Sequence, residues 1–155
     1  FENTKTINYE HWQTDGYLIN VDKEKEKLVK TANNFGRYII FAKSAGSLVT
    51  LKAIFENKIS PVKCIFVGLP IKWAKKNNFD IDIWLKNYSI PTTILQHTND
   101  PLASSHEVQD YIKQKNVTKT ELRELPGDTH DYHEFDLIFD LIKNMMEPLC
   151  SNNIL

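Results

Sequence analysis

Residues 37–48 read RYIIFAKSAGSL, a short apolar run followed by a serine among small residues. The run is rich in β-branched and aromatic side chains, which favours a buried strand, and the apolar residues that follow have helical spacing. The pattern predicts a strand that ends at Ala42 and a helix that begins at Ala45, with Ser44 at the sharp turn between them. Ala42 and Gly46, two residues before and after Ser44, leave room for the strained, closely packed backbone of such a turn.

Apolar runs alternate with segments of helical periodicity along the whole chain. Strands are predicted at residues 6–10, 37–42, 62–68, 92–97 and 120–125, and helices at residues 22–33, 45–57, 71–87, 105–115 and 132–146. Two helix starts carry a capping pattern, in which an acceptor is followed three residues later by a carboxylate: Ser104 with Glu107, and Asp131 with Glu134. This alternation predicts an α/β fold with a doubly wound, mostly parallel sheet.

The composition restricts the class of protein. The chain has 155 residues, of which 41% are hydrophobic and 25% charged, as expected for one globular domain spanning residues 1–155. Its 19 basic and 20 acidic residues give a net charge of -1, which argues against a nucleic-acid partner. No apolar stretch has the length of a membrane span, so no membrane partner is expected. Cys64 and Cys150 lie far apart in the sequence, so a disulfide framework is not expected. The low cysteine content favours a reducing compartment, and a cytoplasmic location is expected.

Polar residues follow the ends of three predicted strands. In an open parallel sheet, ligands bind beyond the carboxyl ends of the strands, so these residues are the candidates for a site. Ser44 follows the strand at 37–42, and Asp100 and His130 follow the two strands nearest the C-terminus. The chain order Ser, Asp, His is that of the hydrolases whose serine lies on a strand-to-helix turn.

The motifs AKSAG at 42–46, TNDPL at 98–102 and PGDTH at 126–130 resemble the α/β-hydrolase fold, in a small form with little or no lid. The resemblance implies a serine hydrolase acting on a small ester, thioester or similar acyl substrate. It implies Ser44 as nucleophile, His130 as general base and then acid, and Asp100 as the residue that orients the imidazole. It also implies the N–H of Ala45 as an oxyanion donor. No cofactor or metal is expected, because the five histidines show no close-set ligand pattern.

The chain departs from the family pattern in two places. Ala42 replaces the first glycine of the GxSxG motif, and HTND at 97–100 lacks the glycine that commonly precedes the acid. An upstream strand and loop, which supply the second oxyanion donor in the family, are not identified. Either some tens of residues precede Phe1, or residues 6–10 occupy the central place in the sheet, or the site lacks half of its oxyanion hole.

Other functions and roles remain open at this stage. Ser44 could cap its helix, and Asp100 could form a turn before Pro101. The alternative to an enzyme is a catalytically silent hydrolase-like module that binds or scaffolds. A flavodoxin-like nucleotide or flavin binder would need a phosphate loop after the first strand, and residues 10–16, with one glycine and two acids, are a poor candidate.

The histidines and acids near the last predicted strand offer alternatives to the implied triad. His133 is the rival of His130, but the first turn of a helix would hold it more rigidly than a loop. Asp128 and Asp131 are fallback acids that lie very close to His130 in sequence. His97 ends a strand and is expected to pack or to support the site from behind.

Two apolar features have more than one interpretation. Trp73, Phe79, Trp84 and Tyr88 either line an acyl pocket or cover the edge of the sheet. The helix at 132–146 has an apolar face that must be buried. If no further helix precedes Phe1, that face is half bare and a homodimer is expected.

Overall fold

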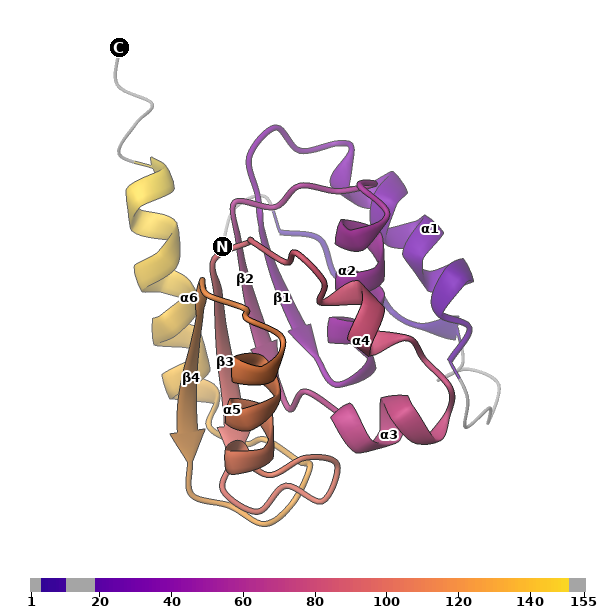
Figure 1. The fold of residues 1–155 in the computed structure, drawn as a ribbon. Helices are drawn as coiled ribbons and strands as arrows, with labels where there is room; N and C mark the ends of the chain where they lie inside the picture. Colours follow the sequence, from indigo (N-terminus) through magenta and orange to yellow (C-terminus); the bar gives the residue numbers. More distant parts are fainter. Residues whose placement is uncertain (1–3, 11–18, 151–155) are drawn as a thin grey trace.

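The computed structural model describes residues 4–10 and 19–150, which include a four-stranded parallel sheet with helices on both faces (Figure 1). The strands lie side by side in chain order, β1-β2-β3-β4. The elements are α1 (Val21–Ala32), β1 (Ile39–Lys43), α2 (Ala45–Phe55), β2 (Lys63–Val67), α3 (Ile71–Lys76), α4 (Ile81–Trp84), β3 (Thr92–His97), α5 (Ser105–Gln114), β4 (Thr120–Leu125) and α6 (Phe135–Cys150). The prediction of a doubly wound parallel α/β sheet is confirmed.

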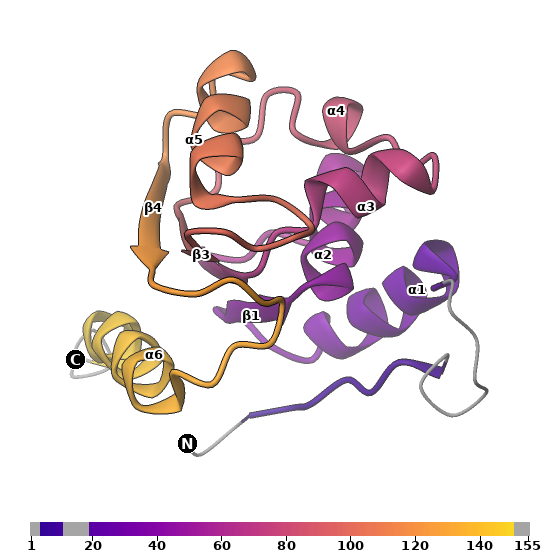
Figure 2. The same ribbon diagram turned by 90° about the horizontal axis from the view of Figure 1, so that it is seen from below.

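Helices cover the central strands β2 and β3 from both sides (Figure 2). Ile65, Val67 and Leu95 face α6 and pack with its Ile138 and Leu141. The alternate residues of the same strands face the layer that contains α2 and α5. Each large apolar side chain buried in this way stabilises the fold by roughly 1.5–3 kcal/mol. Burial on both faces explains why the sequences of these two strands, KCIFV and TTILQH, do not alternate between apolar and polar residues.

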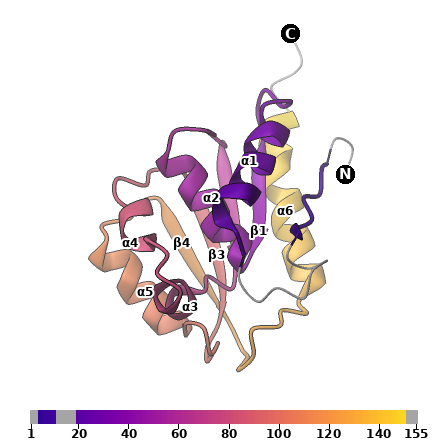
Figure 3. The same cartoon turned by 90° about the vertical axis from the view of Figure 1, so that its right-hand side faces the viewer.

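The outer strands β1 and β4 have alternating burial because each is covered less completely. In β1, Ile40 and Ala42 are buried while Phe41 is 45% exposed. In β4 most side chains are exposed or half-buried, which accounts for the charged sequence TELREL. Helix α1 packs against α2 (Figure 3). Because the strands are parallel, their carboxyl ends lie at the same end of the sheet. The predicted site residues lie in the loops that follow these ends.

The prediction of a strand at residues 6–10 is wrong. Residues 4–9 have no regular secondary structure, and residue 10 lies in a short 3-10 turn outside the sheet. Contacts with α1 hold the segment instead: the Glu10 N–H donates to Glu24 Oε1 at 2.8 Å, and Lys23 and Lys27 pair with the Glu10 carboxylate. The Glu24 carboxylate thus satisfies a backbone N–H that a strand would have paired with a neighbouring strand.

Two of the predicted helices differ by more than two residues from their sequence-based bounds. The region 71–87 forms two short helices, α3 and α4, with Asn78 and Asn87 at positive φ. Helix α6 begins three residues later than predicted, and its predicted capping pair does not form. The Asp131 N–H bonds the Thr129 hydroxyl, and the Glu134 carboxylate contacts His97. The capping box of Ser104 and Glu107 is confirmed.

Within residues 4–10 and 19–150, no helix is long and apolar enough to cross a membrane.

Candidate active site

Ser44 lies on a strained turn between β1 and α2. Its backbone has φ 51° and ψ -123°, which is costly for a residue with a side chain. Backbone hydrogen bonds hold the turn: the Ser44 N–H donates to Val67 O at 2.8 Å, and the Ser47 N–H donates to Ser44 O at 2.9 Å. The Ser44 side chain makes no capping hydrogen bond to α2, so the helix-cap interpretation is wrong and the hydroxyl points elsewhere.

The small residues around Ser44 have the packing role predicted from the sequence. A Cβ atom on Gly46 would lie 2.5 Å from the Tyr9 hydroxyl and 3.5 Å from the Cβ of Ala42. The strand and the helix therefore approach each other as closely as the turn requires. Ala45 occupies the first position of α2, where a backbone N–H has no acceptor within the helix.

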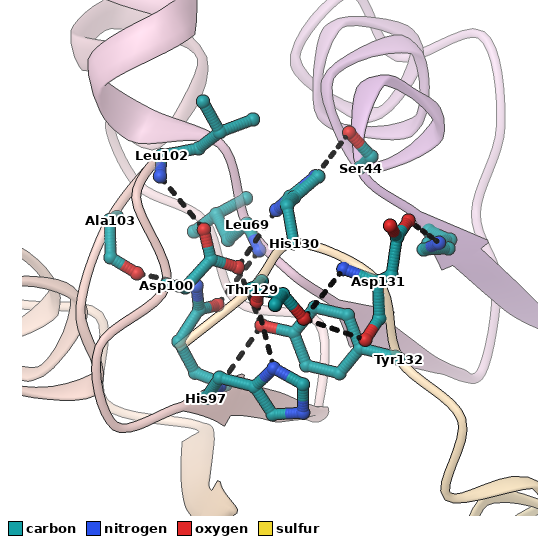
Figure 4. Close-up of polar contacts among 12 residues, drawn as sticks. Ser44, Leu69, His97, Asp100, Leu102, Ala103, Thr129, His130, Asp131 and Tyr132 are labelled. Atoms are coloured by element: carbon teal, nitrogen blue, oxygen red, sulfur yellow. Dashed lines mark hydrogen bonds and ion pairs between the residues drawn. The ribbon is translucent and has the colours of Figure 1, made fainter. Parts of the chain in front are cut away.

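Loops from two other strands bring Asp100 and His130 to Ser44 (Figure 4). The Nε2 atom of His130 lies 2.8 Å from Ser44 Oγ, and its Nδ1 atom lies 2.8 Å from Asp100 Oδ2. Because an ionised carboxylate only accepts, Nδ1 carries a proton and Nε2 is left to accept from the serine hydroxyl. The three predicted residues form one hydrogen-bonded chain.

Three donors converge on the Asp100 carboxylate, which is buried. Besides His130, the Leu102 N–H donates to Oδ1 at 2.8 Å and the Tyr132 hydroxyl donates to Oδ2 at 2.7 Å. Burial alone would raise the pKa of Asp100, but the hydrogen bonds from His130 and Tyr132 outweigh it and hold the pKa below its ordinary value. Asp100 is therefore ionised at neutral pH and accepts the Nδ1–H of His130.

A second layer of residues supports this carboxylate, and the sequence did not reveal most of it. Tyr132 accepts the backbone N–H of His97 at 2.9 Å, and the two rings stack with centroids 3.9 Å apart. The imidazole of His97 bonds the Thr129 carbonyl through Nδ1 and the Glu134 carboxylate through Nε2. The supporting role predicted for His97 agrees with these contacts, whereas no sequence signal indicated Tyr132, and the spacing of Glu134 indicated a helix cap instead.

Buried Gln96 connects the loops on the other side of the site. Its Oε1 accepts the Leu69 N–H at 2.8 Å, and its Nε2 donates to Ala103 O at 2.6 Å. The loop after β2 is thereby joined to the loop that carries Asp100. The available sequence signal for this role was an amide near the end of a strand predicted to be buried, and the structure buries that amide completely.

The alternative site residues lie outside the hydrogen-bonded chain. The His133 ring is edge-on to Phe135, with centroids 6.0 Å apart. Asp131 is exposed and lies 3.9 Å from Lys43 Nζ, and Asp128 is exposed on the loop. Among the described residues, no group of three or more His, Cys, Asp and Glu side chains is placed to hold a metal ion.

The aromatic residues between β2 and β3 pack with the core on the α2 side of the sheet. Trp84 and Tyr88 are buried, and the rings of Trp73, Phe79 and Trp84 contact one another in sequence. Phe79 and Trp84 also border a cavity of about 460 Å³ beside the start of α1, whose lining does not include the Ser44 site. These positions favour the covering role over an acyl pocket.

Several solved structures share this fold. An uncharacterized protein from Bacillus cereus matches at 23% identity over 91% of this chain and 48% of its own, with a TM-score of 0.62. Est1E from Butyrivibrio proteoclasticus matches at 15% identity over 85% of this chain and 72% of its own, with a TM-score of 0.65. An esterase from Pyrococcus furiosus matches at 15% identity over 82% of this chain and 62% of its own, with a TM-score of 0.61.

The chain has the α/β-hydrolase fold, as the three motifs predicted. It spans about half the length of the Bacillus cereus protein. No protein-family model matches the sequence, and no curated protein is significantly similar to it.

Proposed function

We propose that the protein is a serine hydrolase that cleaves a small carboxylic ester, thioester or similar acyl bond through an acyl-Ser44 intermediate. The observation that carries this proposal is the continuous hydrogen-bonded chain from Ser44 through His130 to Asp100. Such a chain is the arrangement in which a serine hydroxyl becomes a nucleophile at neutral pH.

The first half of the reaction forms the acyl-enzyme. Ser44 Oγ attacks the acyl carbon while its proton passes to His130 Nε2, and the resulting imidazolium is stabilised by the ionised Asp100. The Ala45 N–H, at the N-terminus of α2, is the proposed donor to the oxyanion. Collapse of the tetrahedral intermediate expels the alcohol or thiol, which takes the proton from His130 Nε2.

The second half of the reaction releases the acid. Water attacks the acyl-Ser44 carbonyl and gives a proton to His130 Nε2, which then returns it to Ser44 Oγ as the carboxylic acid leaves. The partner is therefore a small-molecule acyl compound, and no cofactor is required.

The experiment is labelling with a fluorophosphonate probe, followed by intact mass. The probe loses fluoride as its phosphorus bonds to Ser44 Oγ. We expect one adduct on the wild type and none on Ser44→Ala or His130→Ala. The matched control is Ser60→Ala, which removes an exposed serine and should leave labelling unchanged. A well-folded wild type without an adduct would contradict the proposal and favour a silent binding module.

The substrate class is then tested with a series of p-nitrophenyl esters and acyl thioesters of increasing chain length. We expect hydrolysis of the short members, abolished by Ser44→Ala. Turnover that survives in Ser44→Ala would show that the hydrolysis does not pass through this serine.

A further inference from the structure

We propose that Tyr132 and His97 are positioning residues for the Ser44 site, and that His97 performs this role as an imidazolium ion paired with Glu134. The inference rests on the proposed hydrolase function, which it deepens by adding a charged group behind the triad. Neither residue is hydrogen-bonded to Ser44, and both act through Asp100 and the loop that carries His130.

Tyr132 connects the acid to the backbone of β3. Its hydroxyl donates to Asp100 Oδ2 and accepts the His97 N–H, so the proton of the hydroxyl is directed at the carboxylate. The same Oδ2 atom accepts His130 Nδ1–H. A hydroxyl fixed at both ends therefore determines where the shared acceptor of His130 lies.

The ring of His97 lies between two acceptors. Its Nδ1 atom is 2.8 Å from the Thr129 carbonyl oxygen, and its Nε2 atom is 3.0 Å from Glu134 Oε1. A backbone carbonyl and an ionised carboxylate can only accept hydrogen bonds, so both ring nitrogens must donate. A neutral imidazole has one N–H and would leave one of these contacts without a proton.

The titratable groups packed around His97 come from the loops after β3 and β4. Glu134 faces Nε2, and burial alone would raise its pKa, but the hydrogen bond from His97 outweighs this and keeps the pKa of Glu134 below its ordinary value. Tyr132 stacks on the ring, and burial raises the pKa of its hydroxyl, so it stays neutral. Asp100 lies beyond the Tyr132 hydroxyl. The His130 ring is edge-on to the Tyr132 ring, with the two centroids 6.0 Å apart.

These contacts hold the His130 loop on both sides of the histidine. Thr129 precedes His130 and is bonded by His97 Nδ1, whereas Glu134 follows it and is bonded by Nε2. Gly127 packs on the same ring, because a Cβ atom there would lie 2.6 Å from His97 Cγ. Loss of the His97 charge would release one side of the loop and loosen His130 over Ser44.

The charge on His97 is tested without reference to activity, by the nitrogen NMR signals of its imidazole. We expect both ring nitrogens to be protonated at about neutral pH in the wild type, and one of them to lose its proton in Glu134→Gln. The control is Asp136→Asn, which also removes one negative charge, but from the first turn of α6. This variant should leave His97 doubly protonated. A wild-type His97 with a single ring proton would overturn the proposal.

The positioning role is tested by the rate of fluorophosphonate labelling. In Tyr132→Phe we expect a fall of about tenfold to a hundredfold, because a hydrogen bond to a charged group is lost. In Glu134→Gln we expect a fall of several-fold, with Asp136→Asn at the wild-type rate. Wild-type rates in Tyr132→Phe and Glu134→Gln would overturn the role.

A further readout separates this inference from the proposed function. The His130 Nδ1 proton is expected to exchange with water faster in Tyr132→Phe than in the wild type, while the thermal unfolding transition stays cooperative. If the wild type shows this proton and a doubly protonated His97 but is not labelled, the hydrolase function fails and the positioning of His130 stands. If Tyr132→Phe leaves the exchange unchanged, the positioning fails whatever the activity.

Discussion

Gly68 lies in direct contact with His130: a Cβ atom on Gly68 would be 2.9 Å from His130 Cε1 and 3.3 Å from its Nδ1. The same atom would be 2.8 Å from Cε2 of Tyr132. Gly68 follows β2 with φ +66°, a conformation that disfavours any residue with a side chain. The glycine thus makes the space into which the imidazole leans over Ser44.

We expect Gly68→Ala to lower the rate of fluorophosphonate labelling by at least about tenfold, because His130 must move away from Ser44. The positive φ alone should cost about 1–2 kcal/mol of the free energy of unfolding. Gly36→Ala is the control, because a Cβ atom on Gly36 meets nothing within 4 Å. Equal labelling of the two variants would show that the contact does not position His130.

Replacement of Ser44 should separate backbone strain from chemistry. Ser44→Gly and Ser44→Ala both remove the hydroxyl, but only glycine relieves the strain at φ 51°. We expect the free energy of unfolding of Ser44→Gly to exceed that of Ser44→Ala by about 1 kcal/mol. Ser44→Gly should therefore unfold at a higher urea concentration. Equal midpoints in urea would mean that the turn is not strained at this residue.

The acid sensitivity of the fold should depend on Asp100. The hydrogen bonds from His130 and Tyr132 put the pKa of the folded-state carboxyl below its unfolded value, despite burial. The stability that it contributes is therefore complete above the unfolded pKa, and is lost as the pH falls through the folded pKa. As the pH falls below the unfolded pKa of the carboxyl, the free energy of unfolding should fall less steeply in Asp100→Asn than in the wild type. Parallel curves from urea titrations would contradict this.

The capping box at the start of α5 should contribute to stability without taking part in the chemistry. Ser104 Oγ accepts the Glu107 N–H at 3.2 Å, and the Glu107 carboxylate accepts the Ser104 N–H at 2.8 Å. We expect Ser104→Ala to lower the free energy of unfolding by about 1 kcal/mol. Ser104→Asp, which keeps an acceptor, should restore most of this loss, and urea denaturation measures both variants.

The sequence predicted best where one local pattern was sufficient. Strands β3 and β4 have the predicted bounds, β2 lies within one residue of its predicted bounds, and β1 lies within two. Short runs of strand-forming residues between turn signals are sufficient to identify such strands. The turn at Ser44 was recognisable because its small neighbours are required locally. Asp131 and Glu134 show the converse: their spacing suits a capping box, but Thr129 and His97 compete successfully for the same groups.

The sequence by itself determined the parallel α/β fold, the strand-to-helix turn at Ser44, and the loops on which Asp100 and His130 lie. These depend on periodicity and turn chemistry, which act over a few residues. Only the tertiary structure decided that the three side chains meet, that Tyr132 and His97 stand behind them, and that residues 4–10 pack on α1 outside the sheet. Such contacts join residues as many as 86 positions apart, so their geometry depends on how the strands are ordered and packed.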